Sequence, residues 1–315
     1  MTAIARYQTE PSRAETQPMR EKRRANPHRR RQLVAAGVML SPFLLLLGGL
    51  LAWPVGWTIV LSLTNEQLTG PAALHHRFIG LGNFVQLLSS RHFSGSLLHS
   101  LIYLVGSAYL GQVVLGFALA LLLRGCTRRI QAVVGGIIVA CWVVPEIIST
   151  FMWFALLGRG GVLAEFLHLF GVGYRPILVT RPMLALDIAN AWRGVAFSMM
   201  LFTAALATIP AEMLEAAMLD GASALRRITH IVLPCIKETL LVAIVLVTLA
   251  TLNDFTLIYG LTGGGPGNAS QVLTTYLYQA GFTEYRIAYG AAVSVILLLI
   301  GMVLSVIYVR ALRKA

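Results

Sequence analysis

The sequence has few charged residues. Asp, Glu, Lys and Arg make up only 12% of its 315 residues, against roughly 25% in soluble domains. Hydrophobic residues make up 57%. A soluble core cannot bury that much apolar sequence, so the composition excludes an ordinary soluble domain and predicts an all-α, polytopic membrane protein.

Lysine is especially rare, which excludes one class of enzyme. The chain has only Lys22, Lys237 and Lys314, and none lies in a G-x-x-x-x-G-K-[ST] sequence. That phosphate-binding loop needs its lysine. We therefore expect no catalytic residues and no nucleotide bound by this chain, and any ATP hydrolysis on which it depends would take place on another polypeptide.

Cysteine and histidine give no sign of a metal or disulfide site. Cys126, Cys141 and Cys235 have neither a pairing pattern nor metal-ligand spacing. They fall in or beside apolar segments and are typical of small buried residues. His168 and His230 lack neighbouring ligands as well. The sequence therefore predicts no bound metal.

Long apolar segments divide the chain. A helix needs about 20 apolar residues to cross the hydrocarbon, and six segments meet this requirement: 34–62, 97–123, 130–157, 183–208, 236–258 and 290–310. The shorter apolar segment 166–179 is interrupted by glycines and Pro176, so we expect an outer loop or re-entrant piece there. The prediction is a six-span membrane domain over residues 33–315.

Basic residues predict the orientation of these spans. Of the 25 lysines and arginines, 18 fall in the tail and the loops on one side of the membrane. Cytoplasmic loops carry this excess. Both termini and the loop 209–235 are therefore expected in the cytoplasm, in a multi-pass membrane protein.

The first 32 residues form a separate basic segment. They hold nine of the basic residues, which explains much of the formal net charge of +12 without nucleic acid as a partner. A polar, basic composition of this kind predicts a disordered cytoplasmic tail held near anionic lipid headgroups.

A polar stretch between two apolar segments carries the most specific pattern. Residues 215–234 read EAAMLDGASALRRITHIVLP. Alanines favour a helix that a partner can approach closely, Asp220-Gly221 allows a sharp stop, and Pro234 suits the start of the next helix. The stretch resembles the cytoplasmic coupling loop, or EAA motif, of binding-protein-dependent ABC importer permeases. The resemblance implies contact with the ATPase through Glu215, Ala216, Ala217, Asp220, Gly221, Ile231, Leu233 and Pro234.

Four further stretches extend the resemblance over nearly all of the chain beyond the tail. They are IGLGNF at 79–84, NAWRG at 190–194, IPAE at 209–212, and NDFTLIY with LTGGGP between 253 and 266. Together they are similar to the maltose and glycerol-phosphate type permeases of the oligosaccharide importer group, in particular the subunit like the larger maltose pore protein. The first outer loop, 63–96, is short, so contact with a binding protein would rest on smaller loops.

This resemblance implies a function and a set of partners. The chain would be the permease subunit of an ATP-driven carbohydrate importer with the type I permease fold, forming half of the translocation pathway by alternating access. Its partners would be a second homologous permease, two ATPase subunits that hold ATP and Mg, and an extracytoplasmic solute-binding protein.

Polar groups within spans indicate the substrate pathway, because they are costly in lipid and usually face a cavity or another helix. The resemblance places the sugar site at Asn190, Arg193, Gly194 and Phe197 in the fourth span, and at Val247, Ala250, Thr251 and Asp254 in the fifth. Each set has i, i+3, i+4, i+7 spacing and so occupies one helical face. Phe197 or Trp192 could cover the apolar face of a sugar.

Three more polar residues lead to structural expectations. Glu146 follows Pro145 within the third span and should pair or become neutral, most simply through an interhelical hydrogen bond. Gln112 is expected to join helices rather than bind ligand. Arg193 and Asp254 should face one pathway, near enough to pair directly or through water.

Two other functions compete with this interpretation. An ion-gradient-driven secondary transporter of a small polar solute would show two halves related by inverted symmetry, and no such repeat is visible. An intramembrane aspartyl hydrolase using Asp187 and Asp254 would need the two carboxylates to share one site. Neither alternative explains the polar stretch at 215–234.

Overall fold

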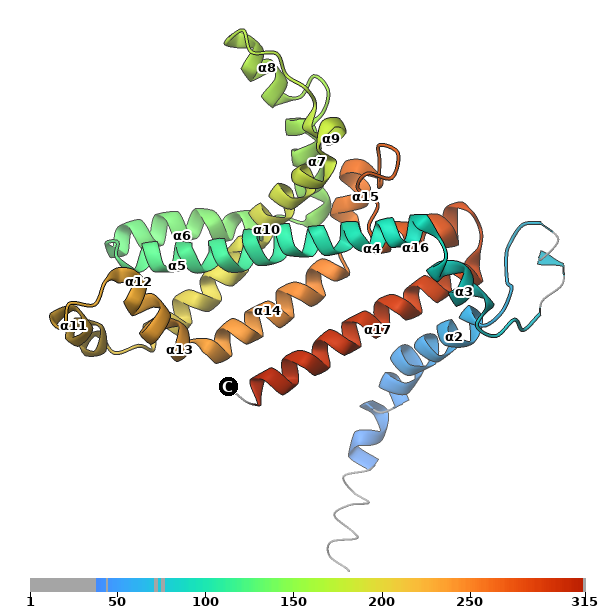
Figure 1. Ribbon diagram of the computed structural model, residues 1–315, viewed down its shortest axis with the longest axis horizontal. Helices are drawn as coiled ribbons and strands as arrows, with labels where there is room; N and C mark the ends of the chain where they lie inside the picture. The colour runs from blue at the N-terminus through green and yellow to red at the C-terminus, as the bar shows by residue number, and fades with distance from the viewer. Residues whose placement is uncertain (1–37, 44, 71–72, 75–76, 314–315) are drawn as a thin grey trace, which may run out of the picture. The chain divides into compact units, whose positions relative to one another are not determined.

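The computed structural model describes residues 38–43, 45–70, 73–74 and 77–313. These residues are mostly helical and contain no strand, only an isolated bridge between Thr64 and Phe78 (Figure 1). The predicted all-α fold is confirmed. The expected disordered tail, residues 1–32, lies outside the described residues.

The chain divides into two units, Met1–Pro54 and Val55–Ala315. The described part of the first unit is apolar helix and includes the π-helix η1, Gly48–Ala52. The helix α2, Trp53–Ser62, leads into the second unit.

The second unit holds the remaining helices. They are α3 Gly82–Leu88, α4 Arg91–Tyr103, η3 Leu104–Val114, α5 Leu115–Arg124, α6 Arg128–Val143, α7 Glu146–Leu157, α8 Val162–Leu169, α9 Ile177–Thr180, α10 Pro182–Ala207, α11 Ala211–Leu219, α12 Ala224–Arg227, η4 Ile228–Val232, α13 Leu233–Cys235, α14 Lys237–Leu252, α15 Thr256–Thr262, α16 Leu273–Tyr278, η5 Gln279–Thr283 and α17 Ile287–Leu312.

Several of these helices can cross a membrane by length and composition. Four qualify alone: Val38–Ser62, Arg91–Arg124, Glu146–Leu169 and Ile287–Leu312. Two pairs qualify if each pair is one span, Pro182–Ala207 with Ala211–Leu219, and Ala224–Cys235 with Lys237–Leu252. The helices within each pair meet at 77°. The described residues therefore supply four to six crossings.

Two of the expected spans are broken, and both breaks have a local cause. The segment 130–157 divides at Val144, whose backbone is extended between α6 and α7. The following Pro145 disfavours helical geometry in the residue before it. The segment 236–258 divides after Leu252, where α14 ends and residues 253–255 lead into α15. Within the segment 166–179, for which an outer loop or re-entrant piece is expected, the first residues belong to α8 and the last to α9.

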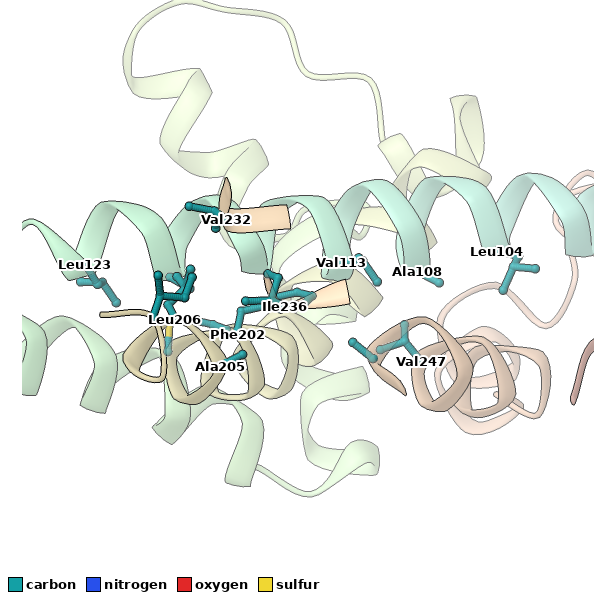
Figure 2. Packing of buried hydrophobic residues seen from close by; sticks show 14 residues of the cluster. Leu104, Ala108, Val113, Leu123, Phe202, Ala205, Leu206, Val232, Ile236 and Val247 are labelled. Atoms are coloured by element: carbon teal, nitrogen blue, oxygen red, sulfur yellow. The ribbon is translucent and has the colours of Figure 1, made fainter. Parts of the chain in front are cut away.

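The continuous helix formed by α4, η3 and α5 packs beside α10 and α14 (Figure 1). Its buried face carries Leu104, Ala108 and Val113, and the facing helices contribute Phe202 and Val247 (Figure 2). These side chains are almost completely removed from solvent. This apolar cluster holds together the helices that carry the expected substrate-pathway residues.

Three glycines allow the close approach of this helix to α10. A Cβ atom added at Gly106 would lie 2.5 Å from the Asp187 carboxylate, and one at Gly111 would overlap the Ala191 side chain. One at Gly116 would lie 2.7 Å from Ser198 Cβ. In an α-helix, residues five apart point about 140° away from each other. The i to i+5 winding of η3 brings such residues nearer to a common face.

The sequence IGLGNF at residues 79–84 has a structural role. The buried Asn83 side chain donates hydrogen bonds to the carbonyl oxygens of Ser62 at 2.8 Å and Thr64 at 2.7 Å. These carbonyls lie where α2 ends and have no partner further along that helix. Asn83 therefore links α3 to the C-terminal end of α2 through two hydrogen bonds.

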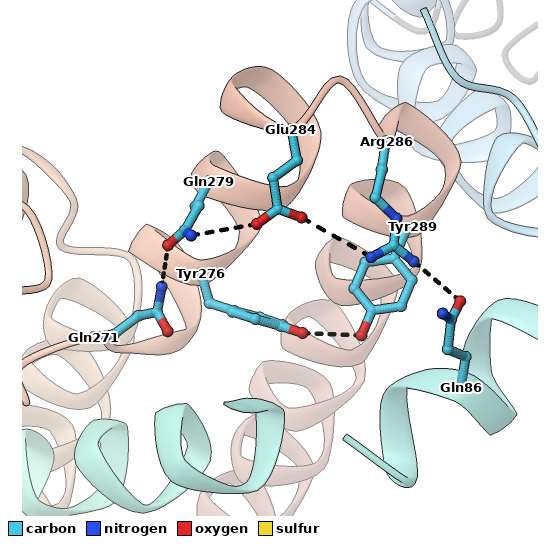
Figure 3. A network of polar contacts seen from close by, with 7 residues as sticks. All are labelled: Gln86, Gln271, Tyr276, Gln279, Glu284, Arg286 and Tyr289. Carbon is cyan, nitrogen blue, oxygen red and sulfur yellow. Dashed lines mark hydrogen bonds and ion pairs between the residues drawn. The ribbon is translucent and has the colours of Figure 1, made fainter. Parts of the chain in front are cut away.

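A polar network connects α3 with the segment that precedes α17 (Figure 3). Arg286 donates to Gln86 at 3.0 Å, lies 3.9 Å from Glu284 and stacks on the Tyr289 ring at 4.1 Å. Glu284 also accepts from Gln279 at 3.2 Å. The network continues from Gln279 to Gln271, and Tyr276 and Tyr289 pair through their hydroxyls at 2.9 Å. These hydrogen bonds hold the chain between α15 and α17 in a fixed arrangement.

The glycine contacts predict a sharp difference between two alanine substitutions. Gly111→Ala is expected to lower the melting temperature of the purified chain in detergent, because its methyl group overlaps Ala191. Overpacking of this kind costs about 1–3 kcal/mol. Gly136→Ala in α6 is the matched control, since a Cβ atom there meets nothing within 4 Å. Equal melting temperatures for the two variants would contradict the proposed close contact.

Candidate functional site

A cavity of about 360 Å³ lies between α10, α14 and the neighbouring helices. Its volume falls at the lower end of the usual range for small-molecule sites. The residues that line it are Gln112, Trp142, Asn190, Arg193, Gly194, Phe197, Leu246, Val247, Ala250, Thr251 and Asp254. All eight residues expected in the substrate pathway are among them. That they contact a substrate remains a prediction.

Helical spacing explains this convergence. Asn190, Arg193, Gly194 and Phe197 lie on one face of the unbroken helix α10. The α14 residues Val247, Ala250 and Thr251 face them across the cavity, but Asp254 follows the end of α14. It therefore reaches the cavity from a non-helical segment, although its spacing predicted that it would share the helical face of the other three.

The expected pairing of Arg193 with Asp254 is corrected by the structure. Arg193 Nη1 lies 2.9 Å from Glu146 Oε2, and the two side chains are 27% and 32% exposed. Glu146 is the first residue of α7, directly after the break at Pro145. The break places this carboxylate beside α10, so that Glu146 pairs with Arg193 between two helices.

Asp254 is held by a different partner. It is only 7% exposed, and its Oδ2 accepts a hydrogen bond from the Tyr103 hydroxyl at 2.6 Å. Its backbone oxygen accepts from Thr274 at 2.8 Å. Asp254 also lies within electrostatic range of Glu146 and Arg193. These contacts fix Asp254 at the cavity and join it electrostatically to the ion pair.

Asn190 is anchored to the continuous helix α4–η3–α5. Its amide donates to the Ser107 hydroxyl at 2.9 Å, and that hydroxyl donates to the Tyr103 carbonyl at 2.6 Å. All three residues are buried. Asn190 and Asp254 are therefore both linked to Tyr103, one through its backbone and the other through its hydroxyl.

Gln112 has the packing role that was expected, together with a place at the cavity. It is 6% exposed, and its amide fills the space where a Cβ atom on Gly194 would lie. Gly194 thus makes room for a polar side chain from the opposite helix. The pair sets the separation between η3 and α10 at the level of the cavity.

Of the two rings expected to cover a sugar, Phe197 lines the cavity and Trp192 does not. Trp192 packs edge-on against Trp153 at 5.8 Å between ring centroids and is not among the lining residues. Trp142, near the end of α6, lines the cavity and lies 6.2 Å from the Phe197 ring. Sequence reasoning missed Trp142. The only available signal was its position four residues before Glu146, beside the Pro145 break.

The second candidate site is the helix α11 with the turn that follows it. None of its residues is buried, and Leu219 is 90% exposed. The helix stops where Gly221 takes φ +75° and donates its N–H to the Met218 carbonyl. The Ala222 N–H then bonds to Ala217 at 2.9 Å. The predicted stop at Asp220-Gly221 is confirmed as a left-handed turn.

The rest of the polar stretch connects this exposed helix to the core. Ile231 belongs to η4, while Leu233 and Pro234 belong to α13. Their neighbours Val232 and Ile236 are 4% and 2% exposed and pack in the apolar cluster of Figure 2. A force on α11 can therefore reach α14 and the cavity through packed side chains.

Nothing in the described residues points to a metal centre, because no group of three or more His, Cys, Asp or Glu side chains lies close enough to hold an ion. Asp187 is not among the residues that line the cavity with Asp254. The described residues thus give no support to a carboxylate pair of the aspartyl hydrolase type.

Comparison with known proteins places this geometry in a family. The model of the family described as binding-protein-dependent transport system inner membrane component matches residues 112–314. The trehalose/maltose transport system permease protein MalF of Thermococcus litoralis is 31% identical over 87% of this chain and 92% of its own length. The sn-glycerol-3-phosphate permease protein UgpA of Agrobacterium fabrum is 29% identical over 88% and 94%.

A solved structure shows the same fold. A chain of a bacterial ABC transporter involved in the import of the acidic polysaccharide alginate matches with a TM-score of 0.74 and 24% identity. The match covers 91% of this chain and 96% of that chain. The fold is therefore that of an ABC transporter permease. Together with the family match, it does not favour an ion-gradient-driven transporter. The chain belongs to the family of binding-protein-dependent transport system inner membrane components, as a multi-pass permease subunit.

Proposed function

We propose that this chain forms half of the translocation pathway of an ATP-driven carbohydrate importer. The observation that carries the proposal is the convergence of eight residues from α10, α14 and the 253–255 break on one cavity. The carboxylate, amide and guanidinium groups among them suit sugar hydroxyls. The name of the trehalose/maltose relative, 31% identical to this chain, supports the same substrate class.

The proposal includes an assembly of several chains. A second homologous permease supplies the other half of the pathway, and an extracytoplasmic solute-binding protein delivers the sugar. Two ATPase subunits hold ATP and Mg, since the three lysines of this chain lie in no phosphate-binding loop. The distribution of basic residues supports a cytoplasmic position for α11 and both termini, where the ATPase subunits could reach α11.

The mechanism follows from the connection between α11 and the core. Closure of the ATPase dimer moves α11 and the turn that follows it, and residues from Glu215 to Gly221 form the contact. The buried Val232 and Ile236 carry that movement to α14. Because packed helices move as rigid bodies, the cavity opens alternately to the two sides of the membrane. The binding energy of ATP thereby shifts the population between the two arrangements.

Gly221→Asp is expected to abolish ATP-dependent uptake while leaving the protein inserted and abundant. The residue has φ +75°, and an added Cβ meets nothing within 4 Å in this chain. A strong effect on uptake would therefore come from the docked ATPase and from strain in the turn. Uptake by the complete complex in vesicles, with protein content measured in parallel, checks the result.

Gly171→Asp is the matched control for this prediction. Gly171 also ends a helix, with φ +69° and nothing within 4 Å of an added Cβ. It lies after α8, outside the coupling stretch, and its substitution should leave uptake within about twofold of the parent, as is usual for surface changes. Normal uptake by Gly221→Asp, or equal loss in both variants, would contradict the role of α11.

Asp254→Ala is expected to reduce uptake at least about tenfold, because it removes the Tyr103 partner and a polar group that lines the cavity. The affinity of the separate binding protein for sugar should not change. Glu165→Ala in the exposed helix α8 removes a carboxylate outside the cavity and serves as the control. Full uptake by the Asp254 variant would show that the cavity is not the pathway.

A further inference from the structure

The cavity holds one cation, and that cation is already paired. Of the described side chains that line it, only Arg193 carries a positive charge. Its guanidinium lies 2.9 Å from Glu146. Asp254 adds a second carboxylate that interacts with both members of the pair. The described lining therefore offers no unpaired positive charge to a ligand.

An anionic ligand would meet an unfavourable field in such a site. Charges that leave water need a close partner of opposite sign. A phosphate or carboxylate entering the cavity would have to take Arg193 from Glu146. It would leave that carboxylate unpaired and lie near the carboxylate of Asp254. Sites that recognise anions instead present free arginines or lysines with their donors unengaged.

The rest of the lining suits an uncharged saccharide. Trp142 and Phe197 present two rings whose centroids are 6.2 Å apart, and these can cover the apolar face of a pyranose. Asn190 and Thr251 provide neutral hydrogen-bonding groups at the same cavity. Val247 and Ala250 add apolar wall. Hydroxyl groups can share the existing hydrogen bonds without displacing a charge.

From this arrangement we infer that the cavity selects uncharged saccharides and excludes phosphorylated or carboxylated ones. The inference rests on the proposed carbohydrate function and narrows it. Charge is a meaningful distinction among the relatives, because one of them is named for sn-glycerol-3-phosphate, an anion. Glu146 is the specificity-determining residue, since it neutralises the only cation in the described lining.

The test measures binding to the permease without the binding protein, which has a selectivity of its own. The complete permease–ATPase complex in lipid nanodiscs is mixed with a neutral glucose disaccharide, its 6-phosphate and its uronic acid analogue. Saturation-transfer NMR then gives the affinity of each. The neutral sugar should bind at least about tenfold more tightly than either anion, because the anions lack a free partner charge.

Two isosteric substitutions probe the cause. Glu146→Gln frees Arg193, and Asp254→Asn replaces the second carboxyl group with a neutral amide. Each should improve binding of the two anions relative to the neutral sugar by at least about fivefold. Glu165→Gln removes the same charge from the exposed surface of α8 and should leave the ratio unchanged. Melting temperatures of all variants identify any that fail to fold.

The outcomes separate this inference from the proposed function. If the parent binds the anions as tightly as the neutral sugar, the charge selection is wrong although the carbohydrate function stands. A ratio that stays unchanged in both folded variants would also contradict the role assigned to Glu146 and Asp254. If no saccharide of either kind binds and none is taken up with ATP and binding protein, the carbohydrate function itself fails.

Discussion

The close contact between α10 and the continuous helix α4–η3–α5 is the constraint on which the rest of the structure depends. It needs residues without side chains at Gly106, Gly111 and Gly116, because a Cβ atom at any of them would overlap α10 or approach it within 2.7 Å. It also brings Tyr103 and Asn190 into one hydrogen-bonded chain through Ser107. The same contact therefore determines both the stability of the helix pair and the position of the polar groups at the cavity.

Gly194 and Gln112 show the same need for a residue without a side chain at the cavity wall. A polar amide from η3 occupies the volume that a side chain on α10 would otherwise take. Small residues that let helix backbones approach, with a polar side chain between them, are the usual means of joining helices in a membrane. Here the joint lies next to Arg193, so a change in helix separation would also shift the ion pair with Glu146.

Most of the residues that line the cavity could be predicted from the sequence, because the spacing of residues along a helix is regular. The i, i+3, i+4, i+7 sets on α10 and α14 converge as expected, since α10 is unbroken and α14 is helical up to Leu252. The same reasoning failed at the breaks. It did not anticipate that Pro145 would bring Glu146 to Arg193, or that Asp254 would lie beyond a helix end and accept from Tyr103. Periodicity describes a helix, whereas the partner across a break depends on tertiary packing.

Alternating exposure of the cavity is the central claim, and thiol accessibility tests it most directly. In the complete complex, with Cys126, Cys141 and Cys235 replaced, Thr251→Cys places one thiol in the cavity wall. A membrane-impermeant thiol reagent is then added from either side, in the nucleotide-free and the nucleotide-trapped states. The account predicts that the reactive side reverses between the two states. Reaction from the same side in both states, or from neither side, would contradict it.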